Sequence, residues 1–207
     1  IALANDWIKK DPFYGIHFKQ EEVDVEFLSR EELDILLNKE FSIKRLEQVR
    51  DTFVFCCFTA LAFADVQQLS REHLIKDNNG ALWIRKARQK TNQMCNIPVL
   101  SIPQRILRKY EDNIECIKKG VLLPVISNQR TNSCLKEIAD LCGITKRLTT
   151  HTARHTAATT VFLGNEVSIE NVAKILGHSN IKMTQHYAKV LDSSIMRDMI
   201  NVERNFL

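Results

Sequence analysis

The apolar residues of this chain change their spacing, and that change limits the folds open to it. From Ser29 to about residue 63, and again from about residue 103 onward, apolar side chains recur at the spacing of a helix face. Residues 73–100 instead follow the spacing of short strands, and the cluster Asp77-Asn78-Asn79-Gly80 suits a tight turn between two of them. The sequence therefore predicts a mainly helical fold with a small antiparallel β-sheet, of the α+β class.

Individual helices can be placed by their start and stop signals. Ser29 and Glu32 have the spacing of a capping box at the start of the first helix of the main domain. A helix over residues 43–63 carries too many apolar residues for a surface helix, so we expect it to be central. Residues 1–12 resemble the end of a helix stopped before Pro12, and residues 13–25 a linker. Further helices are expected over residues 103–110, 129–142, 150–164, 168–176, 181–190 and 193–205.

Composition narrows the class of protein. The chain has 207 residues, of which 44% are hydrophobic, enough for one large packed domain. Its net charge of +4 is compatible with an anionic partner without requiring one. Six cysteines without a CxxC pair indicate buried, reduced thiols, as in a cytoplasmic protein. The longest apolar run, about a dozen residues, is too short to span a bilayer, so no membrane partner is expected.

The segment His151-Thr152-Ala153-Arg154-His155 is the first candidate for a functional site. On a helix, residues 151, 154 and 155 share a face. Two imidazoles and a guanidinium at one place favour an anion, and a phosphate suits the planar fork of arginine. A zinc site is disfavoured, because the zincin pattern needs Glu where Thr152 stands and Arg154 would oppose a cation. The alternative is a surface helix with charges placed by chance.

A second candidate is Leu176-Gly177-His178, followed nine residues later by Tyr187. Gly177 suits a helix stop, which would place His178 in the following turn. Taken alone, a histidine at a helix junction or a tyrosine at a core edge is more often structural. The two residues gain weight only beside the HTARH segment.

The third candidate is the basic segment that runs from Arg85 to Lys90. If the strand is regular, Lys86, Arg88 and Lys90 point to one face and Arg85 to the other. Such a run is ordinarily a solvated charge cluster. Its alternative function is to bind the backbone of DNA.

In this order, the basic hairpin, H-x-x-R-H, L-G-H and the tyrosine resemble the tyrosine recombinase (phage integrase) family. The resemblance covers about residues 27–207 and implies the catalytic-domain fold of these DNA breaking and rejoining enzymes. It assigns residues 26–207 to the catalytic domain, and residues 1–25 to the end of the preceding core-binding domain and an interdomain linker. The sequence TALAFADV, together with RQKT, is most similar to integrases of Bacteroides-type mobile elements, the conjugative transposons.

The resemblance implies a site-specific DNA recombinase with a defined mechanism. Tyr187 would attack the scissile phosphate and form a 3′-phosphotyrosyl intermediate, which a 5′-hydroxyl then resolves during strand exchange. Arg154 would bind the non-bridging oxygens, and His151 and His178 would hydrogen-bond the same phosphate and help to move protons. Lys90 would protonate the leaving 5′-oxygen.

Two further residues have supporting roles in the resemblance, His155 beside the arginine and Asp65 near the amino-terminal motif. Neither a cofactor nor a metal is implied. The partners implied are double-stranded DNA carrying the recombination site, a homo-tetramer on that DNA with residues 191–207 docking on a neighbouring protomer, and accessory DNA-bending proteins. Integration, excision and dimer resolution use the same chemistry, so all three remain open.

One position departs from the family pattern T-G-L-R-x-x-E. Here the segment reads Thr59-Ala60-Leu61-Ala62-Phe63-Ala64-Asp65, with Ala62 in place of the first catalytic arginine. Either the chain is a cleavage-deficient DNA-binding relative, or another cation replaces the arginine. We favour Arg88, because it lies two residues before Lys90 and would point the same way. A type IB topoisomerase, which shares the chemistry, is disfavoured by the wording of HTARH and LGHSN.

Overall fold

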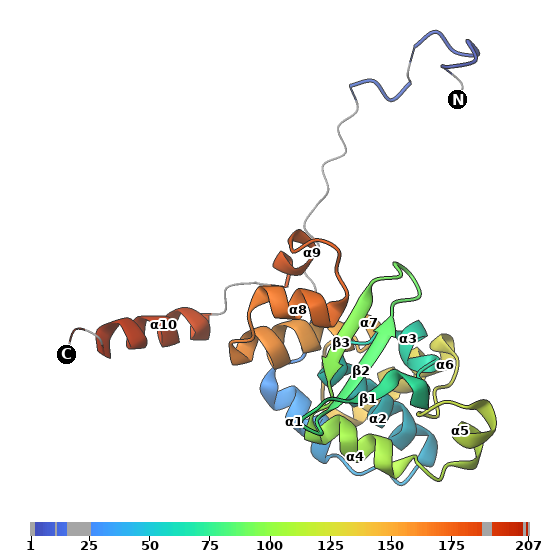
Figure 1. Cartoon of the computed structure of the whole chain (residues 1–207), viewed down its shortest axis with the longest axis vertical. Helices are drawn as coiled ribbons and strands as arrows, with labels where there is room; N and C mark the ends of the chain where they lie inside the picture. Colours follow the sequence, from blue (N-terminus) through green and yellow to red (C-terminus); the bar gives the residue numbers. More distant parts are fainter. Residues whose placement is uncertain (1–2, 11, 16–25, 188–191, 205, 207) are drawn as a thin grey trace.

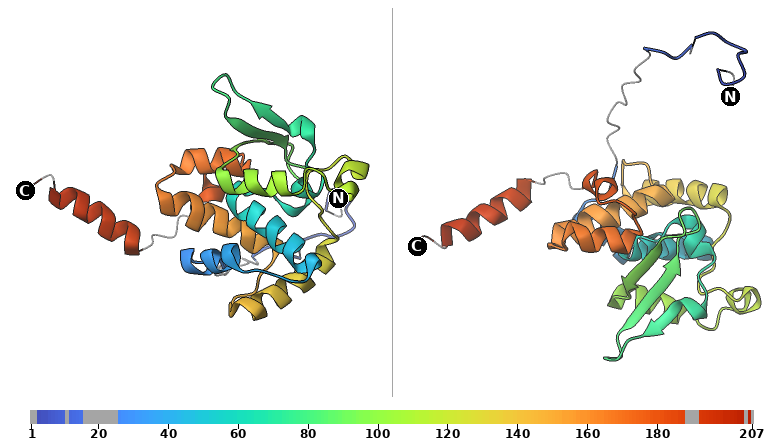
Figure 2. Two further views of the ribbon diagram at one scale, coloured as in Figure 1. Left: turned by 90° about the horizontal axis from the view of Figure 1, so that it is seen from below. Right: turned by 45° about the horizontal axis from the view of Figure 1, so that its top comes forward.

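The computed structural model describes residues 3–10, 12–15, 26–187, 192–204 and 206. Figure 1 shows a body of helices with one small sheet on its surface, and the two further views of Figure 2 show α10 (Asp192–Arg204) standing apart from that body. The fold is mostly helical with a three-stranded antiparallel sheet, as the sequence predicts. No helix in the described ranges is both long enough and apolar enough to cross a membrane.

Helix α2 (Lys44–Thr59) lies at the centre, because nearly all of its last ten residues are buried. It packs against α4 (Ser101–Lys109), α6 (Asn128–Cys142) and α7 (Thr150–Thr156). The predicted helix over residues 43–63 is therefore central, but it is not continuous. Ala60 adopts the left-handed conformation with φ of 56°, which ends α2 and lets α3 (Phe63–Gln67) start in a new direction.

The sheet has the order β1-β2-β3, with β1 Leu74–Lys76, β2 Leu82–Ala87 and β3 Met94–Pro98. A 3₁₀ turn, η1 (Arg71–His73), precedes it. The predicted turn at residues 77–80 is confirmed: Asp77 Oδ1 accepts from the backbone N–H groups of Asn79 and Ala81, and Asp77 Oδ2 from Trp83 Nε1. The strand expected to run on to Lys90 instead ends at Ala87, and residues 89–91 form a turn.

Helix α7 continues into a π-helix, η2 (Ala157–Phe162), and a 3₁₀ turn, η3 (Leu163–Asn165). Two hydroxyl groups of this segment hold the start of the domain. Leu28 N–H donates to Thr156 Oγ1 at 3.0 Å, and Thr160 Oγ1 donates to Leu28 O. Leu28 itself is completely buried. The backbone that enters the domain is thus fixed on both sides to the α7–η2 segment.

The remaining helices agree with most of the predicted ranges. The Ser29–Glu32 capping box is formed at the start of α1 (Arg30–Asn38), and α4, α6 and α8 (Ile169–Leu176) lie where expected. The sequence missed α5 (Ile114–Lys119). Helix α9 (Lys182–Gln185) is shorter than the predicted 181–190, of which residues 188–190 lie outside the described ranges. The predicted helix end at residues 1–12 is wrong for residues 3–10, which form turns and bends.

The core is one cluster that joins α1, α2, α6, α7, α8 and the inner face of the sheet. All six cysteines are free, and five of them are buried, as their apolar surroundings in the sequence indicate. The junction between β3 and α8 belongs to this core. It brings the end of α8 against the sheet, where the candidate residues meet.

Candidate active site

Arg154 on α7 is the centre of the site and is only 6% exposed. Its Nη1 donates to Ala60 O, and its Nη2 donates to Leu176 O. The guanidinium therefore ties the end of α2 to the end of α8. Burial, followed by the nearby charge of Arg88, lowers the pKa of Arg154. In the described part of the chain no carboxylate forms an ion pair with Arg154, although the charge of Asp65 acts on it from a greater distance. A buried guanidinium of this kind is suited to bind an anion.

His178 follows the glycine that ends α8, and it contacts Arg154. The distance from Arg154 Nη2 to His178 Nε2 is 3.3 Å, and His178 Nδ1 lies 2.9 Å from Thr184 Oγ1. Burial, Arg154 and Arg88 lower the pKa of His178 to about 4, so the ring is neutral at pH 7. Because arginine can only donate, Nε2 accepts and the ring proton sits on Nδ1, where Thr184 can accept it.

Tyr187 lies between two of the histidines. Its ring centroid is 5.1 Å from that of His155 and 6.1 Å from that of His178. His151, which is exposed, continues the row at 6.4 Å from His155. Burial, followed by the charges of His151 and Arg154, lowers the pKa of His155 to about 4. The fold thus gathers the tyrosine, three imidazoles and Arg154 from segments about thirty residues apart.

Ala62 lies where the sequence pattern lacks an arginine, at the start of α3. One turn further along α3 is Asp65, a carboxylate only 2% exposed. Arg88, just beyond the end of β2, reaches this carboxylate, with 4.0 Å between Arg88 Nε and Asp65 Oδ2. The charge of Arg88 lowers the pKa values of both Arg154 and His178. A second guanidinium therefore enters the site near position 62, from the sheet.

Asp65 has a second contact, which reaches the turn between β2 and β3. Its Oδ1 accepts from the backbone N–H of Gln89 at 2.8 Å. Lys90 follows in this turn with its side chain exposed. One buried carboxylate therefore lies between Arg88 and the turn that carries Lys90.

Lys86 lies on the inner face of the sheet and is 9% exposed. Its Nζ is 3.1 Å from His73 Nε2 and 3.5 Å from Gln68 O. Lys86 and Arg88 therefore share a face, as the strand pattern predicts, while Lys90 does not continue it because β2 has already ended. The expected separation of Arg85 is confirmed, since Arg85 is exposed on the opposite face.

Sequence reasoning missed three residues that support this site: His73 beside Lys86, Thr184 beside His178, and Cys95 beside Gly177. Gly177 was recognised only as a helix stop. The alternation on β3 places Cys95 inward, which is the one signal that could have drawn attention to it. Thr184 and His73 carry no such signal.

Known proteins resemble this chain over most of its length. The model of the phage integrase family matches residues 26–194. The integrase of Escherichia phage P2 is 27% identical over 194 residues, covering 87% of this chain and 50% of that protein. The tyrosine recombinase XerD of Staphylococcus saprophyticus is 42% identical over 137 residues, covering 61% of this chain and 46% of that protein. The chain thus spans about half the length of these curated relatives.

Solved structures share the fold. A lambda integrase dimer bound to a COC′ core site gives a TM-score of 0.68 at 16% identity, covering 92% of this chain and 57% of that one. The Tn1549 transposon integrase in complex with a circular intermediate DNA gives 0.67 at 18% identity, covering 97% and 74%. At these identities the likeness concerns the fold.

Proposed function

Since the chain belongs to the phage integrase family, we propose that it is the catalytic part of a tyrosine site-specific DNA recombinase. The observation that supports this best is the convergence of Tyr187 and His178 near the buried guanidinium of Arg154, which forms no ion pair with a carboxylate of the described residues. A tyrosine nucleophile needs neighbouring cations to favour its phenolate, and a phosphate needs donors fixed before it arrives. In this proposal Arg154 is both the neighbouring cation and a donor fixed in advance by its bonds to Ala60 O and Leu176 O.

In the proposed reaction the Tyr187 oxygen forms a bond to the scissile phosphorus as the bond to the 5′-oxygen breaks. Arg154 neutralises the non-bridging oxygens, while His151 hydrogen-bonds the same phosphate and helps to move protons. His178 helps to take up the phenolic proton on Nε2, which accepts from Arg154 before the reaction, and once protonated there it can donate to the phosphate. Lys90 donates a proton to the leaving 5′-oxygen. The phosphotyrosine keeps the energy of the broken ester, so a 5′-hydroxyl from another strand can reverse the attack without ATP or a metal.

Arg88 takes the place of the absent arginine in this proposal. Its charge already acts on Arg154 and His178, and its partner Asp65 lies one helical turn from Ala62. Arg88 Nε is buried and has no hydrogen-bond partner in the described structure, so a phosphate oxygen would be bound by the terminal nitrogens of this guanidinium. His155, whose ring is tilted by 38° against that of Tyr187, supports the tyrosine ring.

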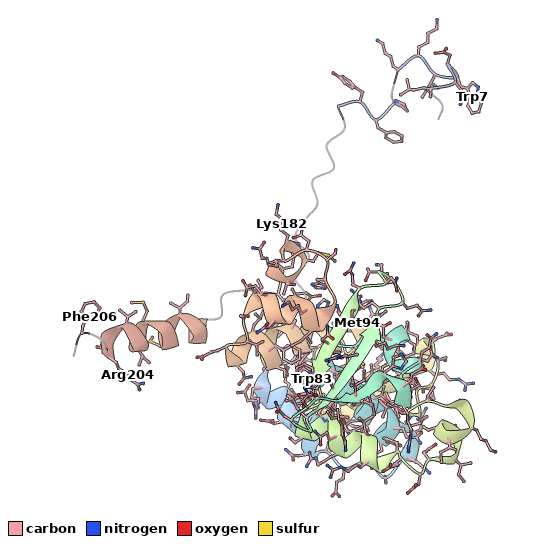
Figure 3. All side chains as sticks on the ribbon, in the orientation of Figure 1. Trp7, Trp83, Met94, Lys182, Arg204 and Phe206 are labelled. Carbon is pink, nitrogen blue, oxygen red and sulfur yellow. The ribbon has the colours of Figure 1, made fainter. Side chains whose placement is uncertain are left out.

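The proposal extends to partners. Double-stranded DNA is the substrate, with Arg88 and Lys90 as the basic side chains along it, and four copies act on it with accessory DNA-bending proteins. The DNA contact that the sequence predicts for Lys86 is not proposed, because Lys86 is 9% exposed and its Nζ lies 3.1 Å from His73 Nε2. Residues 191–207 dock on a neighbouring copy, and the exposed apolar side chains of α10 and beyond support this: Ile195, Met199, Val202 and Phe206. In Figure 3, Arg204 and Phe206 lie clear of the body.

Residues 1–25 are proposed to be the end of a core-binding domain and its linker, and residues 26–207 the catalytic domain. We also propose that the full protein moves a mobile element of the conjugative-transposon type. The wording TALAFADV with RQKT supports that assignment.

A cleavage-deficient DNA-binding relative is the second candidate, and Ala62 is the observation that favours it. The two functions are separated by trapping the covalent intermediate. Full-length protein is mixed with a nicked duplex carrying the joined ends of the element, and the products are resolved on a denaturing gel. A covalent band with the native protein that is absent with Tyr187→Phe supports the recombinase. DNA binding without any covalent band supports the binding-only relative.

The role of Arg88 is tested on the same duplex with a methylphosphonate at the scissile position. This group lacks one charged oxygen and so needs less neutralisation. Arg88→Ala is expected to slow covalent-complex formation on the phosphate by about 10²- to 10³-fold, as loss of one oxyanion donor does, and much less on the methylphosphonate. Arg85→Ala, on the outer face of the same strand, is the control. Equal losses on both substrates would contradict charge neutralisation by Arg88.

A further inference from the structure

Gly177 makes two close contacts that its role as a helix stop does not explain. Its φ of 60° is left-handed, as a residue that ends α8 often requires. A Cβ placed on it would lie 2.6 Å from Cys95 Sγ and 2.8 Å from Arg88 Cδ. Real side chains do not approach so closely, so the backbone of Gly177 is packed directly against both groups.

The neighbours of Gly177 contact the other half of the site. Leu176 O accepts from Arg154 Nη2, and His178 Nε2 lies 3.3 Å from the same nitrogen. Within one three-residue segment, residues 176 and 178 contact Arg154, and Gly177 between them contacts the stem of Arg88. Both arginines are therefore packed against the same short piece of backbone.

Arg88 has little else to hold it. Its Nε has no hydrogen-bond partner in the described structure, and the ion pair with Asp65 is long, at 4.0 Å. A free three-methylene stem would occupy several rotamers and place the guanidinium differently in each. The side chain is nevertheless only 12% exposed. Packing of its stem must therefore fix the position of the Arg88 guanidinium, as directed hydrogen bonds fix that of Arg154.

We propose that Gly177 and Cys95 form a seat for the stem of Arg88, and that this seat sets the reach of its guanidinium into the active site. Cys95 is a positioning residue here: its sulfur, 1% exposed on the inner face of β3, closes the gap between the strand and the end of α8. It does not touch the phosphate. The inference rests on the proposed role of Arg88.

The competing explanation is that Cys95 only fills the core. A core residue affects stability and slows every substrate alike. A seat affects the charge-dependent part of the reaction, and it has no effect once Arg88 is gone. These two signatures separate the explanations.

The experiment measures single-turnover covalent-complex formation by full-length protein on the phosphate and methylphosphonate duplexes. Cys95→Ala leaves a space beside the stem of Arg88, and Cys95→Val introduces a side chain too large for this space. Two variants with opposite changes of volume are used in case one of them fails to fold. We expect each to slow the phosphate reaction about 10- to 100-fold, as small misplacements of a reacting group do, with DNA affinity and the methylphosphonate rate nearly unchanged. Cys95→Ser, of similar size, should restore most of the rate. Cys134→Ala, another buried cysteine on α6, is the control.

A double-mutant cycle with Arg88→Ala decides the matter. If the seat acts through Arg88, then Cys95→Ala adds no further loss to Arg88→Ala. An additive loss, or equal losses on both substrates, overturns the seat. If Arg88→Ala slows the phosphate reaction and Cys95→Ala and Cys95→Val do not, the seat is overturned and the proposed role of Arg88 stands. If Arg88→Ala itself keeps the native rate, the role of Arg88 fails and the seat fails with it.

Discussion

The two buried arginines of the site are held in different ways. Arg154 comes from a helix and donates both terminal nitrogens to backbone carbonyls, those of Ala60 and Leu176. Arg88 comes from a strand end, has an unpartnered Nε and is kept in place by packing and a 4.0 Å ion pair. The hydrogen bonds of Arg154 require the planar fork of a guanidinium, whereas a packed stem and a charge can also be supplied by the unbranched stem and ammonium of lysine. Arg88 is therefore expected to tolerate replacement by lysine better than Arg154 does.

The largest difference should appear when each arginine is replaced by lysine. Arg154→Lys loses the planar fork, leaves two buried carbonyls short of a donor and should lower the free energy of unfolding by about 1–3 kcal/mol. Its covalent-complex rate should fall by about 10²- to 10³-fold. Arg88→Lys keeps the charge and should cost about tenfold, with little change in stability. Single-turnover kinetics and thermal melting measure both. Equal losses of rate in the two variants would contradict the proposed difference in how the two arginines are held.

Replacements of Asp65 can separate two effects on the Arg88 side of the site: the charge beside Arg88 and the contact with the turn that carries Lys90. Asp65→Asn can keep an oxygen for the Gln89 N–H while removing the charge beside Arg88, whereas Asp65→Ala removes both. We expect about a tenfold loss of rate for Asn and up to about 10²-fold for Ala, since small displacements of reacting groups have effects of this size.

A duplex with a 5′-bridging sulfur, a leaving group that needs no proton, tests this division. It should recover the part of the Asp65→Ala loss that comes from Lys90, and it should recover nothing for Asp65→Asn. Glu72→Gln, which removes an exposed carboxylate close to the sheet, is the control. Recovery of the same size in both Asp65 variants would rule out a separate effect on the turn.

The histidines should give the molecule a pH dependence of stability. His155 and His178 have pKa values of about 4 in the fold against an ordinary value of 6.5. Between these two pKa values the unfolded chain binds protons that the folded chain does not. The free energy of unfolding therefore falls as the pH falls from about 6.5 toward 4, and above about pH 6.5 these two histidines no longer affect it. Urea unfolding at pH 7 and pH 5 measures the loss, which His178→Gln should reduce and the exposed His186→Gln should not.

The pKa of His178 reports on both arginines. Arg154 is the larger and Arg88 the smaller electrostatic cause of the low pKa of His178. In Arg88→Ala the pKa of His178, followed by NMR, should rise only part of the way toward 6.5. No change at all would mean that the Arg88 guanidinium lies elsewhere in solution.

The smallest effect concerns the acceptor of Arg154. Ala60 holds a φ of 56°, which costs an alanine about 1–2 kcal/mol. Ala60→Gly should relieve this strain, keep the carbonyl in place and raise the free energy of unfolding by about 1 kcal/mol, or the melting temperature by about 2–4 °C. Asn92, also left-handed but of a type that tolerates the conformation, offers a control in Asn92→Gly. Destabilisation by Ala60→Gly would show that the backbone there is unstrained.

Much of this could be predicted from the sequence, because periodicity and caps are local. The Ser29 capping box, the Asp77–Gly80 turn and the helix stop at Gly177 all follow from residues within one turn of each other. The break of α2 at Ala60 could not be predicted, since alanine carries no stop signal and the αL conformation is imposed by packing and by Arg154. The helix end predicted at residues 1–12 relied on the stop signal of Pro12, but such a signal shows only where a helix could end, and residues 3–10 form turns and bends.

For the site, spacing places HTARH on one helix face and predicts Arg88 on the inner side of the strand. The end of β2 at Ala87, which moves Lys90 into a turn, accompanies a hairpin closed by the backbone bonds from Arg88 N–H to Gln93 O and from Asn92 N–H to Arg88 O. The hydrogen bond from Gln89 N–H in this turn to a carboxylate 24 residues earlier in the chain could not be predicted from local spacing. Contacts between distant segments, such as that of Gly177 with Cys95, leave no trace in local spacing.

The two threonine hydroxyls on Leu28 determine where this domain can be cut. A fragment that begins after Leu28 loses the backbone partner of both Thr156 and Thr160, and Thr156 is two residues from Arg154. Glu26 adds a carboxylate that accepts from the backbone N–H of Arg147, just before α7. A truncated domain for crystallisation or kinetics should therefore start at or before residue 26, since a shorter one would loosen the helix that carries Arg154.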